Sequence, residues 1–165
     1  MEEILKTAIF GYLSEGFKIK INENAGFVDG ISGEIYTVEY VSKNRKGEYI
    51  YHCEEIQQPF LWYEATPLLY NINCLTKPIV VKGYNDGKPF VPIEEIKTNY
   101  RLDILTGVYS DGSKCLWNEK TQSSSYRYWE YAIIEKLNSW KIDYKNLIGQ
   151  GLAIDVETLK ENCYE

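Results

Sequence analysis

The chain has one histidine, His52, and it stands beside a cysteine, Cys53. An imidazole next to a thiol is the pair that cysteine-based nucleophilic catalysis uses. The surrounding segment, residues 49–53, is rich in β-branched and aromatic residues and predicts a strand. Because neighbouring side chains of a strand point to opposite faces, the two groups are not expected to act together. The single histidine also excludes most other schemes that depend on an imidazole.

Two adjacent carboxylate pairs, Glu54-Glu55 and Glu94-Glu95, are the next groups whose types could support chemistry. Hydrolysis by paired carboxylates needs side chains that converge in a cleft at about 5–10 Å. A solvated strand end and a helix N-terminus explain the two pairs better. A small enzyme with a carboxylate-based site stays open as an alternative. A deep pocket would favour it if lined by two or more of Asp103, Asp143, Asp155, Glu94 and Glu95.

The sequence carries no metal or phosphate motif. Its cysteines are scattered, without a close pair or a histidine partner of the kind zinc sites use: Cys53, Cys74, Cys115 and Cys163. Residues 83–88 contain two glycines and a lysine, but the glycine spacing is not that of a phosphate loop and no Ser or Thr follows the lysine. We therefore expect no cofactor, no metal and free thiols.

A run of aromatic residues with one arginine, residues 126–131, begins the strongest helical pattern, at 126–140. The pattern predicts a core stripe of Trp129, Ile133, Leu137 and Trp140. It places Tyr128, Tyr131, Ile134 and Arg127 away from that stripe, as a candidate protein-binding patch. A purely structural role for the run and stacking on nucleic-acid bases are the two alternatives.

These residues must be positioned by the elements around them. In the first half, a helix is expected at 2–14, a strand at 17–21, and a β-hairpin of 34–41 and 48–54 joined by the polar connection 42–47. In the second half we expect strands at 68–75 and 77–82, a turn at 85–87, a helix from Pro92 to as far as Leu105 that Gly107 breaks, and a short helical piece at 144–148.

Together these elements predict an α+β fold in which a small antiparallel β-sheet packs against about three helices. The 165 residues fit a single domain, 1–165, with a β-rich part at about 17–91 and a mostly helical part at about 92–150. A chain of this length can bury a core without disulfides or metal.

Charge and composition limit the partners. The net charge is −6, and only three of the 18 basic residues are arginine, so direct binding to nucleic acid is not expected. An acidic protein is suited to a basic groove on another protein. Fifteen tyrosines and four tryptophans are residue types enriched at protein interfaces. With an acidic N-terminus and no apolar run of about 18 residues, we expect no membrane contact and a cytoplasmic protein.

The second half of the chain contains a characteristic set of segments: 78–81, 87–96, 133–143, 147–148 and 151–155. In these segments it resembles uncharacterised bacteriophage and prophage accessory proteins. Lys141 follows Trp140 at a place where those proteins often carry histidine. The resemblance brings no known activity, but it implies a small protein of a phage or mobile element that works inside the host cell.

These observations favour a non-enzymatic protein that binds a host protein or nucleoprotein effector. Within that class, an inhibitor of a bacterial defence nuclease, of the anti-CRISPR kind, suits a small acidic domain, because blocking a large basic nucleoprotein needs surface rather than chemistry. A structural or replication accessory role in the phage is the alternative within the same genomic context. The sequence does not indicate an oligomeric state.

Overall fold

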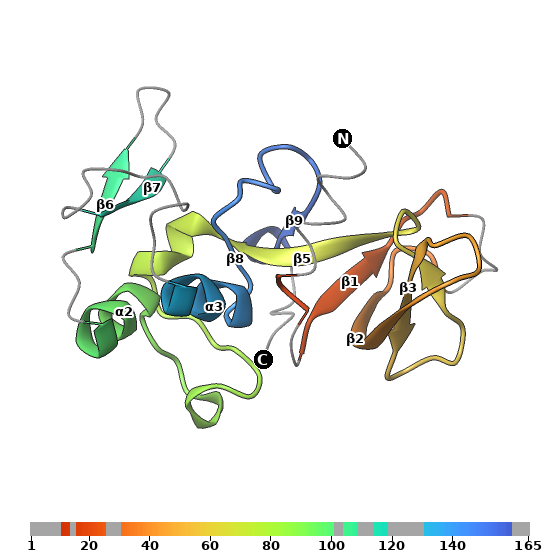
Figure 1. Cartoon of the computed structure of the whole chain (residues 1–165), viewed down its shortest axis with the longest axis horizontal. Helices are drawn as coiled ribbons and strands as arrows, with labels where there is room; N and C mark the ends of the chain where they lie inside the picture. The colour runs from red at the N-terminus through yellow and green to blue at the C-terminus, as the bar shows by residue number, and fades with distance from the viewer. Residues whose placement is uncertain are drawn as a thin grey trace.

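The structure is a computed structural model that describes residues 11–13, 16–25, 31–100, 104–108, 114–118 and 131–159. Helices α2 (Pro92–Tyr100) and α3 (Tyr131–Ser139) lie at one end of an elongated body (Figure 1). Strands β2 (Ile35–Lys43) and β3 (Tyr49–Cys53) lie at the other end, and β5 (Ala65–Asn71) spans the distance between them.

Strands β2 and β3 form the predicted hairpin. Its turn is closed by a hydrogen bond of 2.9 Å from the Asn44 N–H to the Glu48 carbonyl. Asn44 Oδ1 accepts two further hydrogen bonds, from the backbone N–H groups of Lys46 and Glu48. Gly47 has a φ of 80°, a left-handed conformation that glycine adopts without a steric cost. The turn sets the register of the pair, with Tyr40 opposite His52.

The sheet is mixed rather than antiparallel. It has seven strands in the order β4-β3-β2-β1-β5-β8, with β9 also paired to β5. The added strands are β1 (Lys18–Ile21), β4 (Phe60–Leu61), β8 (Ile142–Asp143) and β9 (Ile154–Asp155). The last two run parallel to β5, because the chain returns to this strand in the same direction after α3 and again after the turns that follow β8. The α+β class is confirmed, but the expected small antiparallel sheet is wrong.

Helix α2 begins at Pro92 as predicted, and Ile93 and Ile96 on one face of it are buried. Glutamates in its first turn complement the helix dipole. The expected extension of this helix to Leu105 is wrong. The helix ends at Tyr100, and Leu105 lies in a strand.

That strand, β6 (Ile104–Val108), pairs antiparallel with β7 (Lys114–Asn118) in a separate two-stranded sheet. Gly107 lies inside β6, opposite Cys115, and does not act as a helix breaker. The alternation of Ile, Thr and Val favours an extended backbone in this segment. Pairing with β7 provides hydrogen-bond partners for backbone N–H and C=O groups of β6.

Helix α3 confirms much of the predicted core stripe. Ile133 and Leu137 are buried, and Trp140 is buried in the turn after the helix. Residues 126–130, with Trp129, lie outside the described part of the chain. The expected helix at 2–14 also falls outside it, except for residues 11–13, which include a turn. The described residues thus contain two α-helices instead of about three.

Three shorter expectations are corrected. The strand expected at 68–75 ends at Asn71, and a 3-10 helix (Ile72–Thr76) continues from it. Residues 77–82 make only one bridge, between Ile79 and Phe90, because Pro78 and Pro89 have no backbone N–H with which to extend a ladder. The segment 144–148 consists of turns.

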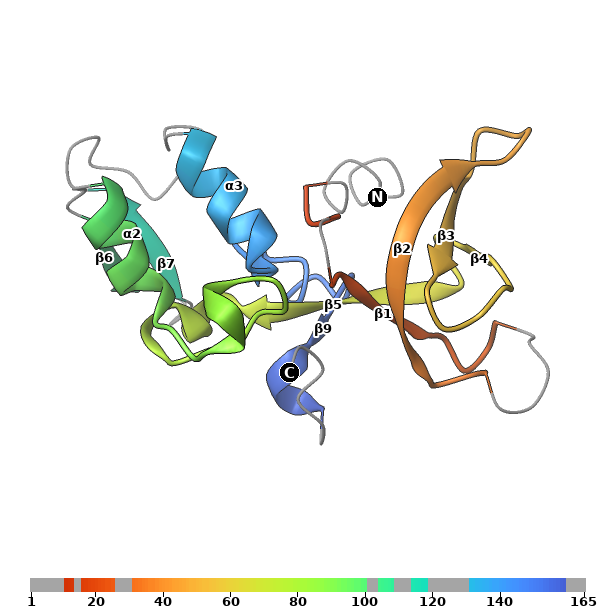
Figure 2. The same ribbon diagram turned by 90° about the horizontal axis from the view of Figure 1, so that it is seen from below.

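Strand β5 separates two hydrophobic clusters. Leu68 belongs to a first cluster with α2, α3 and Trp140, whereas Leu69 belongs to a second cluster beneath the hairpin with Phe60. Neighbouring side chains of a strand face opposite ways, so one strand serves both clusters. Figure 2 shows β5 running between the helical end and the curved strands β2 and β3. No helix among the described residues is long and apolar enough to span a bilayer.

Candidate functional site

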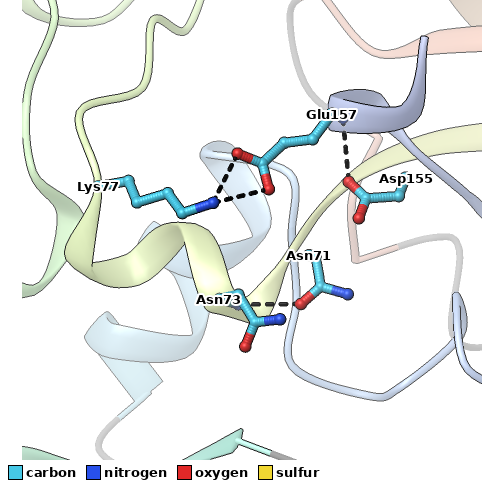
Figure 3. Close-up of polar contacts among 5 residues, drawn as sticks. All are labelled: Asn71, Asn73, Lys77, Asp155 and Glu157. Atoms are coloured by element: carbon cyan, nitrogen blue, oxygen red, sulfur yellow. Dashed lines mark hydrogen bonds and ion pairs between the residues drawn. The ribbon is translucent and has the colours of Figure 1, made fainter.

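The carboxylates that would favour an enzyme have structural partners. Three polar residues end the parallel strands: Asn71 on β5, Asp143 on β8 and Asp155 on β9. Each accepts a backbone N–H of the following turn, with Asn71 Oδ1 2.9 Å from Asn73 N and Asp155 Oδ1 3.0 Å from Glu157 N (Figure 3). They stop the strands and begin the next turns, as Asn and Asp commonly do.

The cluster in Figure 3 also contains an ion pair. Lys77 Nζ lies 3.0 Å and 3.2 Å from the two carboxylate oxygens of Glu157, and it joins the end of one 3-10 helix to another (Val156–Thr158). Both side chains are largely exposed, so the pair adds little stability. The pair holds the 3-10 helix Val156–Thr158 next to the segment that follows β5.

The glutamates of α2 are likewise engaged. Glu95 accepts a hydrogen bond of 3.1 Å from the Tyr84 hydroxyl, and Glu94 lies 3.4 Å from Lys97 one turn along the helix. The remaining carboxylate of the predicted set, Asp103, lies outside the described residues. Each described member of that set is thus held by a hydrogen bond or an ion pair to a neighbouring group.

Asp143 is the most buried of these carboxylates. Its oxygens accept the backbone N–H groups of Leu147 at 2.9 Å and Ile148 at 2.7 Å. Burial raises the pKa of Asp143 above its ordinary value of 3.8, against the opposing effect of these hydrogen bonds. A raised carboxyl pKa means that the native state holds the proton more tightly than the unfolded chain does.

We expect this linkage to appear in a comparison with Asp143→Asn. Below the unfolded pKa the native carboxyl contributes its full stability, and it loses that contribution as the pH rises through the folded pKa. The stability of the wild type relative to the variant should therefore increase as the pH falls from about 7 to about 3.5. Urea unfolding at several pH values measures this difference. A difference that shrinks as the pH falls would contradict the role assigned to Asp143.

Beside Asp143, a lysine packs between two tyrosine rings. Lys145 Nζ lies 5.2 Å from the centroid of the Tyr12 ring and 5.3 Å from that of Tyr144. Burial lowers the pKa of Lys145, and the charge of Asp143 opposes that effect. Tyr144 packs against both hydrophobic clusters, so this arrangement joins them. Packing and cation–π attraction account for it without a catalytic role.

Lys141, which follows Trp140, is fully buried. Its φ of 59° lies in the left-handed region, which a non-glycine residue rarely adopts. Its Nζ donates a hydrogen bond of 2.9 Å to the Ser139 carbonyl. The residue makes the tight reversal from α3 into β8, a structural task.

Two described cysteines are free and buried, Cys53 and Cys74. Burial raises the pKa of each thiol to about 12, and the charges of Glu55 and Glu157 respectively add to the effect. Thiols in such surroundings are inert, because the thiolate is the reactive form. Among the residues that the structure describes, no three metal-ligating side chains gather closely enough to hold an ion.

We expect Cys53 and Cys74 to resist alkylation in the folded protein. At about pH 8, a pKa near 12 leaves the thiolate fraction more than about a thousandfold below that of an ordinary cysteine. Brief iodoacetamide treatment followed by peptide mass spectrometry should leave both unmodified in buffer and modify both in about 6 M guanidinium chloride. Rapid labelling of either thiol in buffer would show that its segment opens readily.

The predicted binding patch on α3 is only partly placed. Tyr131 is 75% exposed, as expected. Ile134 is half-buried and packs against the first hydrophobic cluster, so its expected position on the far side of the helix is wrong. The apolar stripe of α3 is wider than the sequence pattern predicts, and Ile134 belongs to its edge, where it contacts the core. Tyr128 and Arg127 lie outside the described residues, and the patch stays a prediction.

The described surface has a groove that the sequence did not indicate. It is open to solvent, has a volume of about 470 Å³, and lies at the end of the β2–β3 hairpin. Its lining consists of two aromatic rings, three carboxylates, one thiol, one aliphatic side chain and one amide: Tyr40, His52, Glu39, Glu54, Glu55, Cys53, Ile56 and Gln57.

The aromatic part of the groove is a stacked pair. The rings of Tyr40 and His52 lie nearly parallel, with centroids 4.1 Å apart and an interplanar angle of 9°. A contact of 2.8 Å between His52 Nε2 and Ser42 Oγ orients the imidazole. Tyr40 nevertheless remains 53% exposed. The pair is thus a fixed aromatic surface directed at solvent, a feature typical of interface anchors.

A β-bulge adds a carboxylate to that surface. The register shifts between Val38 and Tyr40, so Glu39 is the extra residue of β2. This irregularity brings Glu39 into the same groove as its neighbour Tyr40. The carboxylate of Glu55 anchors the bulge, because its two oxygens lie 2.9 Å and 3.1 Å from the Thr37 nitrogen.

The remaining carboxylates differ in availability. Glu54 lies 3.9 Å from Lys82, at the limit of an ion pair, and both side chains are about half exposed. No described residue forms a hydrogen bond or an ion pair with the Glu39 side chain. The groove therefore offers Glu39 and Glu54 beside an exposed ring.

Sequence reasoning missed this site because it treated Glu54-Glu55 as a solvated strand end and His52 only as a possible catalyst. The register counted back from the Asn44–Gly47 turn would have placed Tyr40 opposite His52. The bulge at Glu39 leaves no comparable signal.

Comparisons of the chain with protein-family models, with curated proteins and with solved structures find no match.

Proposed function

We propose that this protein acts without catalysis by binding a host protein, and that the groove at the end of the β2–β3 hairpin is its docking site. In the phage or mobile-element context that the sequence resemblance implies, the partner is a bacterial defence nuclease that the protein inhibits in the host cytoplasm. The observation that carries the proposal is the Tyr40 ring, stacked on His52 yet half exposed, beside the carboxylate of Glu39, unpaired among the described residues, and the half-exposed carboxylate of Glu54.

The character of the groove supports a protein partner rather than nucleic acid. Its carboxylates repel phosphate, and the chain as a whole carries a charge of −6. The same charges attract the basic surface with which a nuclease holds its own nucleic acid. Occupation of that surface by an acidic protein would exclude the nucleic acid.

The described carboxylates support a role without chemistry. Asp143 and Asp155 cap turns, Glu95 accepts a hydrogen bond from Tyr84, and Glu94 pairs within α2. Groups held by such local bonds are poor candidates for a shared catalytic proton. The groove, in contrast, has groups suited to contact. Its one thiol, Cys53, is buried, and burial raises the pKa of that thiol to about 12, which makes it a poor nucleophile.

Affinity capture tests the proposal. The tagged chain is exposed to a lysate of a bacterial host, with and without nuclease treatment, and bound proteins are identified by mass spectrometry. We expect a specific protein that stays bound after nuclease treatment and is lost with Tyr40→Ala. The matched control is Tyr63→Ala, which removes another tyrosine that is 52% exposed but lies outside the groove. A partner retained by Tyr40→Ala would exclude the groove as its docking site.

A further inference from the structure

The groove combines a flat ring with carboxylates, and this combination has a specific ligand chemistry. The exposed area of Tyr40 offers a π-surface, and its ring is held in place by His52 at 4.1 Å. Cations bind the faces of such rings, and arginine does so more often than lysine. Glu39 and Glu54 line the same groove and supply acceptors for charged N–H donors.

We infer that the groove binds an arginine side chain on a basic segment of the partner protein, an inference that rests on the proposed function. A guanidinium is planar and weakly hydrated, so it stacks on an aromatic ring while its N–H donors stay in the ring plane. Those donors are free to reach carboxylates beside the ring. A lysine ammonium is a compact, strongly hydrated charge and cannot make both contacts in this way.

The geometry around Glu39 favours a formed site over a chance cluster of acids. The bulge places Glu39 beside Tyr40, and Glu55 holds the bulge by accepting the Thr37 N–H with both oxygens. Glu55 is thus a positioning residue, whereas Glu39 and Glu54 are the expected ligand contacts. The neighbouring lysine, Lys82, is 3.9 Å from Glu54, and an arriving guanidinium would displace a contact of marginal length.

The direct test is a titration of the isotope-labelled full chain with two capped peptides, Gly-Arg-Gly-Arg-Gly and Gly-Lys-Gly-Lys-Gly, followed by NMR. We expect the arginine peptide to shift the ring signals of Tyr40 and His52 and to bind at least about fivefold more tightly than the lysine peptide. Equal affinity for the two peptides, or shifts confined to other surfaces, would overturn the inference.

Variants separate the ring from the charges. Tyr40→Leu should abolish the preference for arginine while leaving weak attraction to both peptides. Glu39→Gln with Glu54→Gln should weaken both peptides by at least about fivefold. Tyr63→Leu should change neither result, because Tyr63 lies outside the groove. Retention of the arginine preference by Tyr40→Leu would contradict the assigned stacking.

The peptide result and the partner result fail independently. If Tyr40→Ala abolishes the partner complex but the arginine peptide does not bind the groove, the docking site stands and the arginine inference is overturned. If the arginine peptide binds as expected but the partner binds Tyr40→Ala as tightly as the wild type, the arginine site is supported. The proposed docking function is then contradicted.

Discussion

Trp140→Ala should lower the free energy of unfolding by about 3–5 kcal/mol, one of the two largest effects expected in the chain. Trp140 is 1% exposed, and its ring lies 5.1 Å from that of Phe90 and 5.4 Å from that of Tyr84. Removal of the indole would leave a cavity that the surrounding turns and helices cannot fill. Urea unfolding followed by circular dichroism measures the loss.

A second substitution at the same position separates packing from polarity. No described residue accepts a hydrogen bond from the buried Trp140 indole N–H. Trp140→Phe keeps a ring and removes that unsatisfied donor, so its cost should stay below about 1.5 kcal/mol. Tyr131→Ala, at a residue 75% exposed, should change stability by less than about 0.5 kcal/mol. A loss as large for Trp140→Phe as for Trp140→Ala would contradict this account.

Phe60→Ala should cost a similar amount, about 3–5 kcal/mol, at the other end of the molecule. Phe60 is fully buried in the second cluster and stacks on Tyr36 with centroids 5.8 Å apart. Because β5 contributes Leu68 to one cluster and Leu69 to the other, neither cluster can lose its order without affecting the same strand.

The expected result is therefore one unfolding transition for the wild type, Trp140→Ala and Phe60→Ala alike. Far-ultraviolet circular dichroism and tryptophan fluorescence should give coincident curves in the wild type and in Phe60→Ala, which keep all the tryptophans. This outcome would support the predicted single domain. Two separated transitions, of which Phe60→Ala shifts only one, would show instead that the two clusters unfold independently.

Much of the local structure could be predicted because its signals are local. The hairpin follows from alternating residues on either side of a polar turn that ends at Gly47, and α2 begins where Pro92 and two glutamates require. The spacing of Ile133 and Leu137 fixes the buried face of α3. Each of these patterns extends over enough residues to show its period.

The remaining features depend on contacts between distant segments. Strands β8 and β9 are two residues long, too short for a period, and they exist because β5 pairs with them. The groove depends on a one-residue bulge at Glu39, and no local residue preference predicts this bulge. The sequence predicts Ile134 on the far side of α3, because it shows which face of the helix is apolar but not how wide a surface covers that face.

The central claim is that this protein docks on its partner through the Tyr40 groove. The measurement that tests it most directly is the dissociation constant of the captured partner for the wild type, Tyr40→Ala, Tyr63→Ala and Tyr131→Ala, by isothermal titration calorimetry. We predict that Tyr40→Ala weakens the complex at least about tenfold and leaves the melting temperature nearly unchanged, whereas Tyr63→Ala binds within about twofold of the wild type. Wild-type affinity for Tyr40→Ala, together with a large loss of affinity for Tyr131→Ala, would contradict the account. It would indicate that the docking site lies on α3.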